Sequence, residues 1–390
     1  MGRQINTMYY FIRFFVQQAL TLYCRRITVN DDSYLELKGP LLLASNHPNA
    51  FFDALILASR MRQPLYFLAL GELTDKWIAR WLLKILHIIP VYQLQDNRPN
   101  QERNYQSFAR CVEVLSSGGI ILVFSEGICE NNWRLRPFKK WTARVVLEAL
   151  EHPQLQSGLR VLPVGLNYNS YKSPGNTIFI QYGTPISINE LKKGTPEAEK
   201  IHEFNELLRD SISALMLQTG DKTGEIQMVL SNIPNLQNEE IKITPDAPDI
   251  DTTHKLLEKL KKPGYLVCSE NPFGQTLFYV LVLGIPALLG WTGHLLFYYP
   301  LKYFVRIKTA GTVFYDSVLF MVLFLLYPFY WMAVNISGYF IFRNPSVQVI
   351  LICLPLLGYA TLHWQVNAQR LRNYYAISKQ ERKILRDYFS

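Results

Sequence analysis

Short apolar runs alternate with stretches of helical periodicity between residues 40 and 183. Each apolar run is bounded by Gly, Pro or Asn, which is typical of buried β-strands. The stretches between the runs repeat apolar residues every three or four positions, as on one face of a helix. This alternation predicts an α/β fold, a mixed sheet with covering helices. The predicted strands are 40–45, 64–70, 87–92, 119–125, 160–167 and 177–182, and the predicted helices are 52–62, 74–85, 101–116 and 139–151.

The pattern becomes polar and helical after Gly183. An amphipathic stretch covers 196–218, and a segment rich in Lys, Glu, Asp and Pro continues to about Gly264. We interpret both as a helical appendage and linker. The predicted domains are 1–30 (an N-terminal membrane helix), 31–190 (the α/β domain), 191–270 (the appendage and linker), 271–366 (transmembrane region) and 367–390 (a basic tail).

Three long apolar runs follow Thr276, at 277–299, 313–332 and 347–364. About 20 residues at a rise of 1.5 Å cross a bilayer core of about 30 Å, so each run predicts a membrane segment. The fold class is therefore α/β with additional C-terminal transmembrane helices.

The basic residues favour one orientation of these segments. They gather at 302–308 and in the tail from Arg370, whereas the loop between the second and third runs holds little beyond Arg343. Three simple crossings would place both basic regions opposite the α/β domain, against the positive-inside rule. A re-entrant bend at Gly284-Ile285-Pro286 would instead keep all three in the cytoplasm. The prediction is a multi-pass protein of the cell membrane whose α/β domain faces the cytoplasm.

The N-terminal stretch from Ile5 to Cys24 is rich in Phe, Tyr, Leu and Ile. It lacks a small-residue cleavage site, so we do not expect a secretory signal. Flanking and internal arginines suit lipid headgroups and predict a helix that lies in the membrane interface. An amphipathic helix packed on the core is the alternative. The arginines are Arg3, Arg13, Arg25 and Arg26.

The composition narrows the possible partners. The chain is 49% hydrophobic and 18% charged, and its 40 Lys and Arg against 31 Asp and Glu favour anionic partners. The basic residues lie beside apolar runs and no nucleic-acid-binding motif is present, so nucleic acid is not an expected partner. The five cysteines form no C-x-x-C pair and show no metal-ligand spacing, so we predict no disulfide framework and no metal. No cofactor is predicted either.

Two polar segments follow predicted strands. Asn-His-Pro-Asn-Ala-Phe-Phe-Asp occupies 46–53 and Phe-Ser-Glu-Gly occupies 124–127. Ligands of such sheets collect beyond the carboxyl ends of the strands, which is where both segments fall. A histidine beside a carboxylate can take a proton from a hydroxyl there, since the carboxylate fixes its tautomer and stabilises the imidazolium.

Asp53 is the natural partner of His47. On a continuous helix, residues six apart lie about 240° apart around the axis and cannot meet. Pro48 and Asn49 favour a turn, so we predict a helix that begins only near Phe51 and allows the two side chains to approach. The alternative is a strand-end histidine that caps backbone groups.

Several ordered blocks carry a resemblance to a known family. They read NHPNAFFD at 46–53, FSEG at 124–127, VLPVGLNY at 161–168 and IFIQYGTPI at 178–186. Over about Leu35 to Ile188, the chain resembles the four-block glycerophosphate acyltransferase family, which moves a fatty acyl group from a thioester to glycerol phosphate or lysophosphatidate.

The resemblance implies a glycerol-3-phosphate acyltransferase-like domain in which His47 is the general base and Asp53 orients it, with no covalent acyl-enzyme. It also implies acyl-CoA or acyl carrier protein as donor, with a phospholipid precursor and membrane lipids as further partners. The substrate-binding residues near the pair would be Asn46, Asn49, Glu126 and Gly127.

The chain departs from the family pattern in three ways. The histidine and aspartate are separated by five residues where four are usual, which resembles a branch related to glycerol-3-phosphate and dihydroxyacetone-phosphate acyltransferases. Ser125 replaces a proline. Gln93 stands where the family brings an arginine to the acceptor phosphate, so either Arg98 supplies that charge or the acceptor carries no phosphate there.

A basic stretch with interleaved aromatics covers 131–140. A guanidinium fork matches phosphate oxygens, so Arg134, Arg136 and Lys139 are candidates to hold anionic groups of the acceptor or of coenzyme A. A solvated loop is the alternative. Ser125 lacks the flanking glycines of a nucleophile elbow and is not expected to act as a nucleophile.

These observations predict a membrane-bound acyltransferase of phospholipid biosynthesis that acts on a hydroxyl of glycerol-3-phosphate or lysophosphatidate. Two alternatives stay open. One is an O-acyltransferase for a lyso-aminolipid or another hydroxylated lipid, and the other is a catalytically silent membrane scaffold with the same fold.

Overall fold

The structure is a computed structural model that describes residues 2–70, 81, 83–92, 98–131, 134–168, 171, 174–186, 188, 196–216, 272–376 and 378–380. The chain forms two compact units. The first contains residues 1–21, 27–168 and 178–216, and the second contains residues 22–26 and 169–177 together with the C-terminal helices. Each unit is described by itself below.

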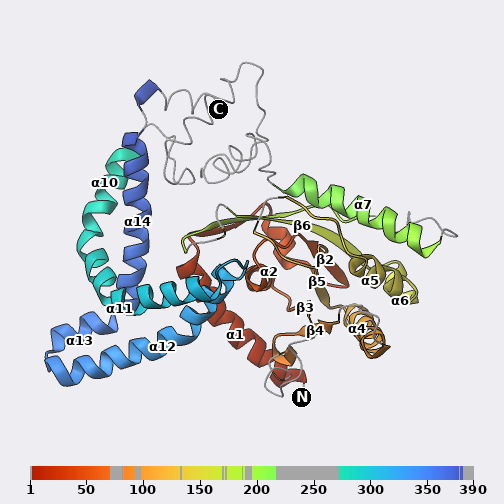
Figure 1. The fold of residues 1–390 in the computed structure, drawn as a ribbon, viewed down its shortest axis with the longest axis horizontal. Helices are drawn as coiled ribbons and strands as arrows, with labels where there is room; N and C mark the ends of the chain where they lie inside the picture. The colour runs from red at the N-terminus through yellow and green to blue at the C-terminus, as the bar shows by residue number, and fades with distance from the viewer. Residues whose placement is uncertain are drawn as a thin grey trace. The chain divides into compact units, whose positions relative to one another are not determined.

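The first unit is built on a seven-stranded sheet with the order β1-β7-β6-β2-β5-β3-β4. Figure 1 labels the strands β2 to β6 of this sheet. The pairs β2–β5, β2–β6, β3–β4 and β3–β5 are parallel, whereas β6–β7 is antiparallel. The predicted mixed α/β sheet is therefore confirmed. The strands are β1 (Arg26–Val29), β2 (Leu41–Ser45), β3 (Leu65–Leu70), β4 (Ile88–Val91), β5 (Ile120–Phe124), β6 (Arg160–Tyr168) and β7 (Thr177–Tyr182).

The helices of this unit cover both faces of the sheet. The crossover from β2 to β3 runs toward the β4 edge, whereas those from β4 to β5 and from β5 to β6 run back. Because such crossovers are right-handed, α2 belongs on one face and α4 and α5 on the other. The helices are α1 (Gly2–Tyr23), α2 (Phe51–Arg60), α4 (Arg98–Ser116), α5 (Trp141–Leu150), α6 (Pro153–Gln156) and α7 (Glu197–Leu215), with a short 3₁₀ turn at Asp32–Glu36.

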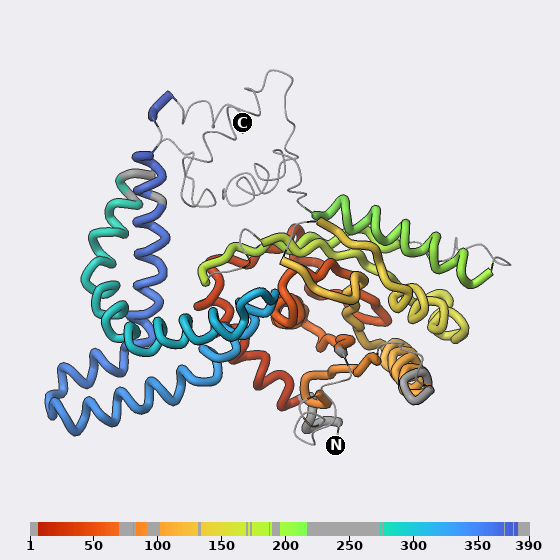
Figure 2. Tube along the Cα trace, in the orientation of Figure 1, coloured from red at the N-terminus to blue at the C-terminus, as the bar shows by residue number. Residues whose placement is uncertain are grey.

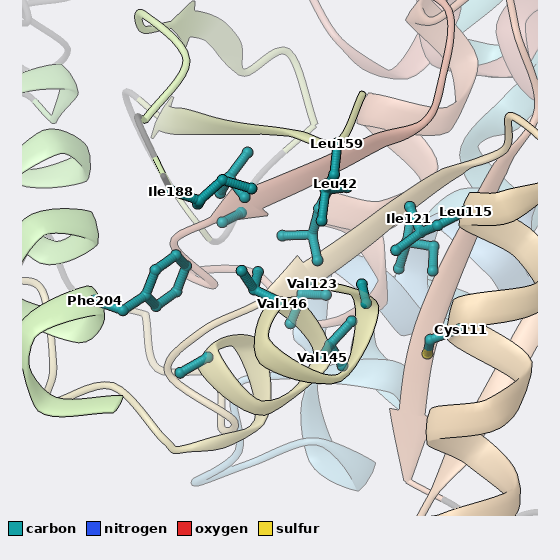
Figure 3. Close-up of a cluster of buried hydrophobic side chains, with 14 of the residues drawn as sticks. Leu42, Cys111, Leu115, Ile121, Val123, Val145, Val146, Leu159, Ile188 and Phe204 are labelled. Carbon is teal, nitrogen blue, oxygen red and sulfur yellow. The ribbon is translucent and has the colours of Figure 1, made fainter. Parts of the chain in front are cut away.

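The main core lies between the sheet and the helices α4, α5 and α7. Figure 3 shows Val146 of α5 and Phe204 of α7 beside the strand residues Leu42 and Val123, all of them almost completely buried. Alternate strand residues such as Leu43 are equally buried and point to the opposite face, because successive side chains of a strand alternate. This two-sided burial explains why successive residues are apolar at residues 41–44 of β2 and at Ile120–Phe124 of β5.

The predicted strands agree with the observed ones to within about two residues, but β1 was missed. It is four residues long, half-buried, and falls inside the segment predicted as an N-terminal helix domain. The predicted appendage helix at 196–218 is present as α7. Much of the predicted helix at 74–85 lies outside the described residues, and so does the whole segment from 217 to 271.

The helix α1 packs one face onto the first unit. Arg13 Nη1 donates to Arg62 O at 3.0 Å and Gln17 Nε2 donates to Ser59 O, so the polar residues that interrupt its apolar sequence bind carbonyls in the last turn of α2 and just beyond its end. The ring of Tyr9 stacks on His87 with centroids 4.7 Å apart. Burial lowers the pKa of His87 to about 4, so this histidine is uncharged at neutral pH and serves packing.

The second unit consists mainly of long apolar helices. In the described part, α12 alone is long and apolar enough to cross a membrane, and the number rises to three if each of two bent pairs is one span. The first pair bends by 56° at Leu283, next to the predicted break, and the second bends by 58° at Cys353, which the sequence did not predict. These helices are α10 (Pro272–Val282), α11 (Gly284–Lys308), α12 (Tyr315–Phe342), α13 (Pro345–Ile352) and α14 (Leu354–Ala376).

The helices α11 and α14 run side by side (Figure 2). A Cβ atom at Gly290 would lie 2.1 Å from the carbonyl oxygen of Leu357, so only glycine permits this approach. Polar side chains in these helices find partners, as when His294 Nε2 contacts the hydroxyl of Tyr327 at 2.9 Å. Both features are typical of helix packing in lipid, where close backbone approach and interhelical hydrogen bonds replace the hydrophobic effect.

A buried carboxylate lies in the first turn of α12. Asp316 has no exposed surface and accepts hydrogen bonds from Tyr23 Oη at 3.0 Å and from Asn176 Nδ2 at 2.9 Å. All three residues belong to the second unit. A buried charge needs such donors, so this cluster holds Tyr23 and Asn176 to the start of α12.

Gly165 of β6 gives the first test of the packing. A Cβ atom there would lie 2.4 Å from Leu215 O and 2.7 Å from Leu215 Cβ of α7. Gly165→Ala should therefore destabilise the protein by about 1–3 kcal/mol, the usual cost of overpacking. Thermal unfolding in detergent measures the shift. Gly158→Ala is the matched control, because its Cβ would meet Gln154 O at an ordinary 3.5 Å; equal melting temperatures for both variants would contradict the assignment.

Candidate active site

The two polar segments meet at one rim of the sheet. The strands β2 and β5 are parallel neighbours, and Ser45 pairs with Phe124, the last residue of each. His47 and Glu126 thus each lie two residues beyond a strand end. The main chain of His47 donates to Glu126 Oε1 at 2.9 Å, which confirms that the rim brings the two segments together.

His47 and Asp53 form a hydrogen-bonded pair. His47 Nδ1 lies 2.9 Å from Asp53 Oδ2. The helix α2 begins at Phe51, as predicted, after Ala50 takes a positive φ of 49°, so the chain turns and brings Asp53 of the first helical turn back to the histidine. Because the carboxylate accepts a hydrogen bond from Nδ1–H, the proton of the neutral imidazole is on Nδ1 and Nε2 carries the free lone pair. Nε2 is the nitrogen that would accept a proton from a substrate hydroxyl.

The surroundings of the imidazole restrict its motion. Its ring stacks on Phe124 at a centroid distance of 3.9 Å, with the planes 13° apart. The side chain of His47 is 17% exposed, whereas that of Asp53 is completely buried. One edge of the imidazole is therefore accessible to solvent, whereas the Asp53 carboxylate is not.

Asp53 accepts hydrogen bonds on both carboxylate oxygens. Besides His47, the main-chain N–H of Asn49 donates to Oδ2 at 2.8 Å, and Tyr168 Oη donates to Oδ1 at 2.5 Å. Tyr168 ends β6 and is fully buried. We did not single it out from the sequence, although it closes the VLPVGLNY block; a polar residue at the carboxyl end of a buried strand was the available signal.

Asn46 extends the sheet by its side chain. Its Nδ2 donates to Leu166 O at 3.0 Å and its Oδ1 accepts from Leu166 N at 2.7 Å. The amide thus continues the pairing between the chain of β2 and β6 beyond Ser45 and fixes the residue before His47. Asn46 and Asn49 are both buried, and their predicted role in substrate binding stays a prediction.

Glu126 is also held by main-chain donors. Its Oε1 accepts from His47 N and its Oε2 accepts from Arg136 N at 3.3 Å, so the carboxylate joins the histidine segment to the loop before α5. Burial raises the pKa of Glu126, and the two donors only partly oppose this effect. Next to it, Gly127 adopts a φ of +70°, a conformation that favours glycine, and the Lys139 side chain packs directly over it.

The predicted cationic residues lie in different environments. Arg136 forms an ion pair with Glu130 and is half-buried, whereas Arg134 and Lys139 are exposed. Arg98 is the first residue of α4, and its side chain lies outside the described part of the structure, as does Gln93. Three of the four basic candidates, like Glu126, lie in the connection between β5 and α5.

The remaining reactive groups near the pair are neutral at physiological pH. Burial, with a smaller contribution from the charge of Asp53, raises the pKa of the Cys129 thiol to about 11. The hydroxyl of Ser125 is buried and accepts a hydrogen bond from Thr142 Oγ1 at 3.0 Å. Within the described ranges, no group of three or more His, Cys, Asp or Glu residues could hold a metal ion.

Comparison with known proteins finds a family to which this region is similar. Residues 26–167 match the Acyltransferase family, and this segment contains the His47–Asp53 pair and the strands β1 to β5 with nearly all of β6. Over this segment, which is less than half of its length, the chain is therefore similar to the Acyltransferase family.

Two individual proteins are similar to parts of the chain. An uncharacterized acyltransferase of Schizosaccharomyces pombe (strain 972 / ATCC 24843) is 30% identical over 112 residues, which are 27% of this chain and 16% of that protein. This chain thus corresponds to a small part of that relative's length. The crystal structure of the 1-acyl-sn-glycerophosphate (LPA) acyltransferase PlsC from Thermotoga maritima aligns with 55% of this chain and 82% of its own, at a TM-score of 0.40 and 18% identity.

The raised pKa of Glu126 predicts a pH-dependent stability. A carboxyl group whose pKa is raised in the folded state contributes stability that is complete below its unfolded value of about 4.3 and is lost as the pH rises through the folded value. Glu126→Gln does not titrate. The free energy of unfolding of the wild type relative to this variant should therefore fall as the pH rises from about 4.3 toward neutrality. Denaturant unfolding in detergent at a series of pH values measures the difference, and a difference that grows with pH would contradict the assignment.

Proposed function

We propose that this protein transfers a fatty acyl group from acyl-CoA or acyl carrier protein to a hydroxyl of glycerol-3-phosphate or lysophosphatidate at a membrane. The observation that carries the proposal is the His47–Asp53 pair at 2.9 Å, placed at the carboxyl rim of a sheet in a domain similar to the Acyltransferase family. The resemblance of the four sequence blocks to glycerophosphate acyltransferases supports the substrate class.

The geometry suits general-base catalysis without a covalent intermediate. His47 Nε2 takes the proton of the acceptor hydroxyl while that oxygen attacks the thioester carbonyl. The tetrahedral intermediate collapses, the C–S bond breaks, and the imidazolium returns the proton to the departing thiolate. Asp53 stabilises the imidazolium throughout. The products are an ester and a free thiol, so atoms and charge balance, and proton transfer of this kind supplies about 10² to 10⁴ in rate.

The cations of residues 134–139 support an anionic substrate. Arg134 and Lys139 are exposed on the loop that follows Glu126, and the Lys139 side chain packs over Gly127, so phosphate groups of the acceptor or of coenzyme A would meet positive charge on this loop. The predicted contribution of Arg98 is part of this proposal. An acceptor without a phosphate, such as a lyso-aminolipid, and a silent scaffold are the competing proposals.

The membrane location rests on two groups of residues. One consists of the long apolar helices of the second unit. The other is the free face of α1, where Tyr10, Phe11 and Phe14 are 47%, 65% and 55% exposed although the opposite face is buried. Aromatic side chains at this density suit the bilayer interface, so we propose that α1 lies in it. A cytoplasmic α/β domain and a re-entrant first segment complete the proposed topology.

His47→Gln tests the proposed chemistry. Purified full-length protein is assayed with labelled acyl-CoA and acyl carrier protein against glycerol-3-phosphate, lysophosphatidate, a lyso-aminolipid and a neutral monoacylglycerol. We expect transfer to a phosphorylated acceptor and a loss of about 10² to 10⁴ in kcat for His47→Gln, because the proton acceptor is removed.

Two controls accompany this assay. His152→Gln removes an exposed histidine of the same unit and should leave the rate unchanged. Ser125→Ala should also remain active, and a trapped acyl-enzyme on Ser125 would refute the mechanism. Transfer only to the lyso-aminolipid would favour the first competing proposal, and no transfer to any acceptor by a folded protein would favour the scaffold.

Spin labels on α1 test its location. The full chain is placed in lipid nanodiscs with a label at Phe14→Cys or, as the matched control, at His152→Cys on an exposed turn of the same unit. The label at position 14 should collide more often with oxygen, which concentrates in lipid, and the label at 152 more often with a water-soluble nickel chelate. Equal accessibility at the two positions would place the aromatic face in water.

A further inference from the structure

Tyr168 is a buried tyrosine whose hydroxyl points at the catalytic pair. Its Oη lies 2.5 Å from Asp53 Oδ1, and neither residue has any exposed surface. An ionised carboxylate can only accept hydrogen bonds, so the phenol is the donor. The contact joins residues 115 positions apart in the chain.

We propose that Tyr168 is a positioning residue of the His47–Asp53 pair. Its hydroxyl holds Asp53 Oδ1 so that Oδ2 stays against His47 Nδ1, and it takes up part of the carboxylate charge so that the imidazolium is stabilised only moderately. The kinetic part of this inference rests on the proposed acyl transfer.

The orientation follows from where the donors lie. Oδ2 accepts from the main chain of Asn49 and from His47, whereas Oδ1 accepts from Tyr168. Donors on both oxygens fix the plane of the carboxylate, because rotation about its terminal bond would stretch at least one hydrogen bond. Without the phenol donor, the carboxylate could turn away from Nδ1.

Tyr168 is itself on a rigid element. It is the last residue of β6 and pairs with Ile178 of β7. The side chain of Asn46 binds both main-chain groups of Leu166, two residues earlier. The end of β6 is thus tied to the segment that carries His47, and the phenol oxygen is placed by the sheet rather than by a loop.

The effect of the Tyr168 hydroxyl on the charge of Asp53 has a direction that can be predicted. Removing the phenol donor leaves more negative charge on Asp53 to stabilise a protonated imidazole. His47 would then stay protonated to higher pH. The acidic limb of the plot of rate against pH would therefore shift to higher pH. The described titratable groups near the pair include Glu126, which accepts from the His47 main chain, Cys129, whose thiol is neutral, and Arg136, whose charge acts on both. None of these groups is altered when only the phenol oxygen is removed.

Tyr168→Phe is the test, since it keeps the ring and removes the donor. Tyr182→Phe is the matched control: Tyr182 ends β7, is 2% exposed, and its hydroxyl contacts Met61 Sδ rather than the pair. We expect kcat for Tyr168→Phe to fall about tenfold, the size of one hydrogen bond in the transition state, with its acidic limb at higher pH. Tyr182→Phe should keep both the rate and the profile of the wild type.

A second readout does not depend on acyl transfer. Diethylpyrocarbonate modifies neutral imidazole, so the rate of carbethoxylation of His47, followed by mass spectrometry across pH, reports its protonation. In Tyr168→Phe this profile should move to higher pH, and in Tyr182→Phe it should not move.

The outcomes separate the two proposals. If the wild type transfers no acyl group, or His47→Gln equals it, the proposed function fails, while the carbethoxylation profiles still decide the role of Tyr168. If Tyr168→Phe matches the wild type in both profiles, or merely lowers the melting temperature and the rate with no shift along the pH axis, Tyr168 is a packing residue and the inference is overturned.

Discussion

A carboxylate without solvent exposure must be hydrogen-bonded, and Asp53 is such a group at the centre of the candidate active site. Its donors come from His47, from the main chain of Asn49 and from Tyr168 at the end of β6. Each donor is needed to keep the charge buried, and each therefore constrains the element that carries it. The burial of one charge thus fixes the turn before α2, the start of that helix and the end of a neighbouring strand relative to one another.

The parallel sheet provides the frame in which this is possible. Since β2 and β5 end in register, the segments after them leave the sheet side by side, and Glu126 can accept the main-chain N–H of His47. Asn46 links the same segment to Leu166 on the other side. The main chain around the imidazole is consequently held by side chains on both flanks before any substrate binds, which is the preorganisation that proton transfer requires.

The apolar helices of the chain provide partners for their polar side chains. In the first unit, α1 uses Arg13 and Gln17 to bind carbonyls in the last turn of α2 and just beyond its end, and leaves aromatic side chains exposed on its other face. In the second unit, Gly290 permits α11 and α14 to approach closely, and His294 finds a partner in Tyr327. Both arrangements pair polar groups with partners and leave apolar side chains on the outside, which is the pattern that a lipid environment favours.

The sequence by itself determined the alternation of strands and helices, the turn that lets His47 reach Asp53, and the apolar C-terminal segments. These features depend on residues close in the chain: period-two and period-3.6 patterns, the Pro48-Asn49 turn, and runs long enough to span a bilayer. Only the tertiary structure decided that β1 joins the sheet, that the second bent pair breaks at Cys353, and that Tyr168 donates to Asp53. A four-residue edge strand carries too little periodicity to be recognised. A hydrogen bond between residues 115 apart depends on strand order and register, which arise when the whole sheet assembles rather than from any local pattern.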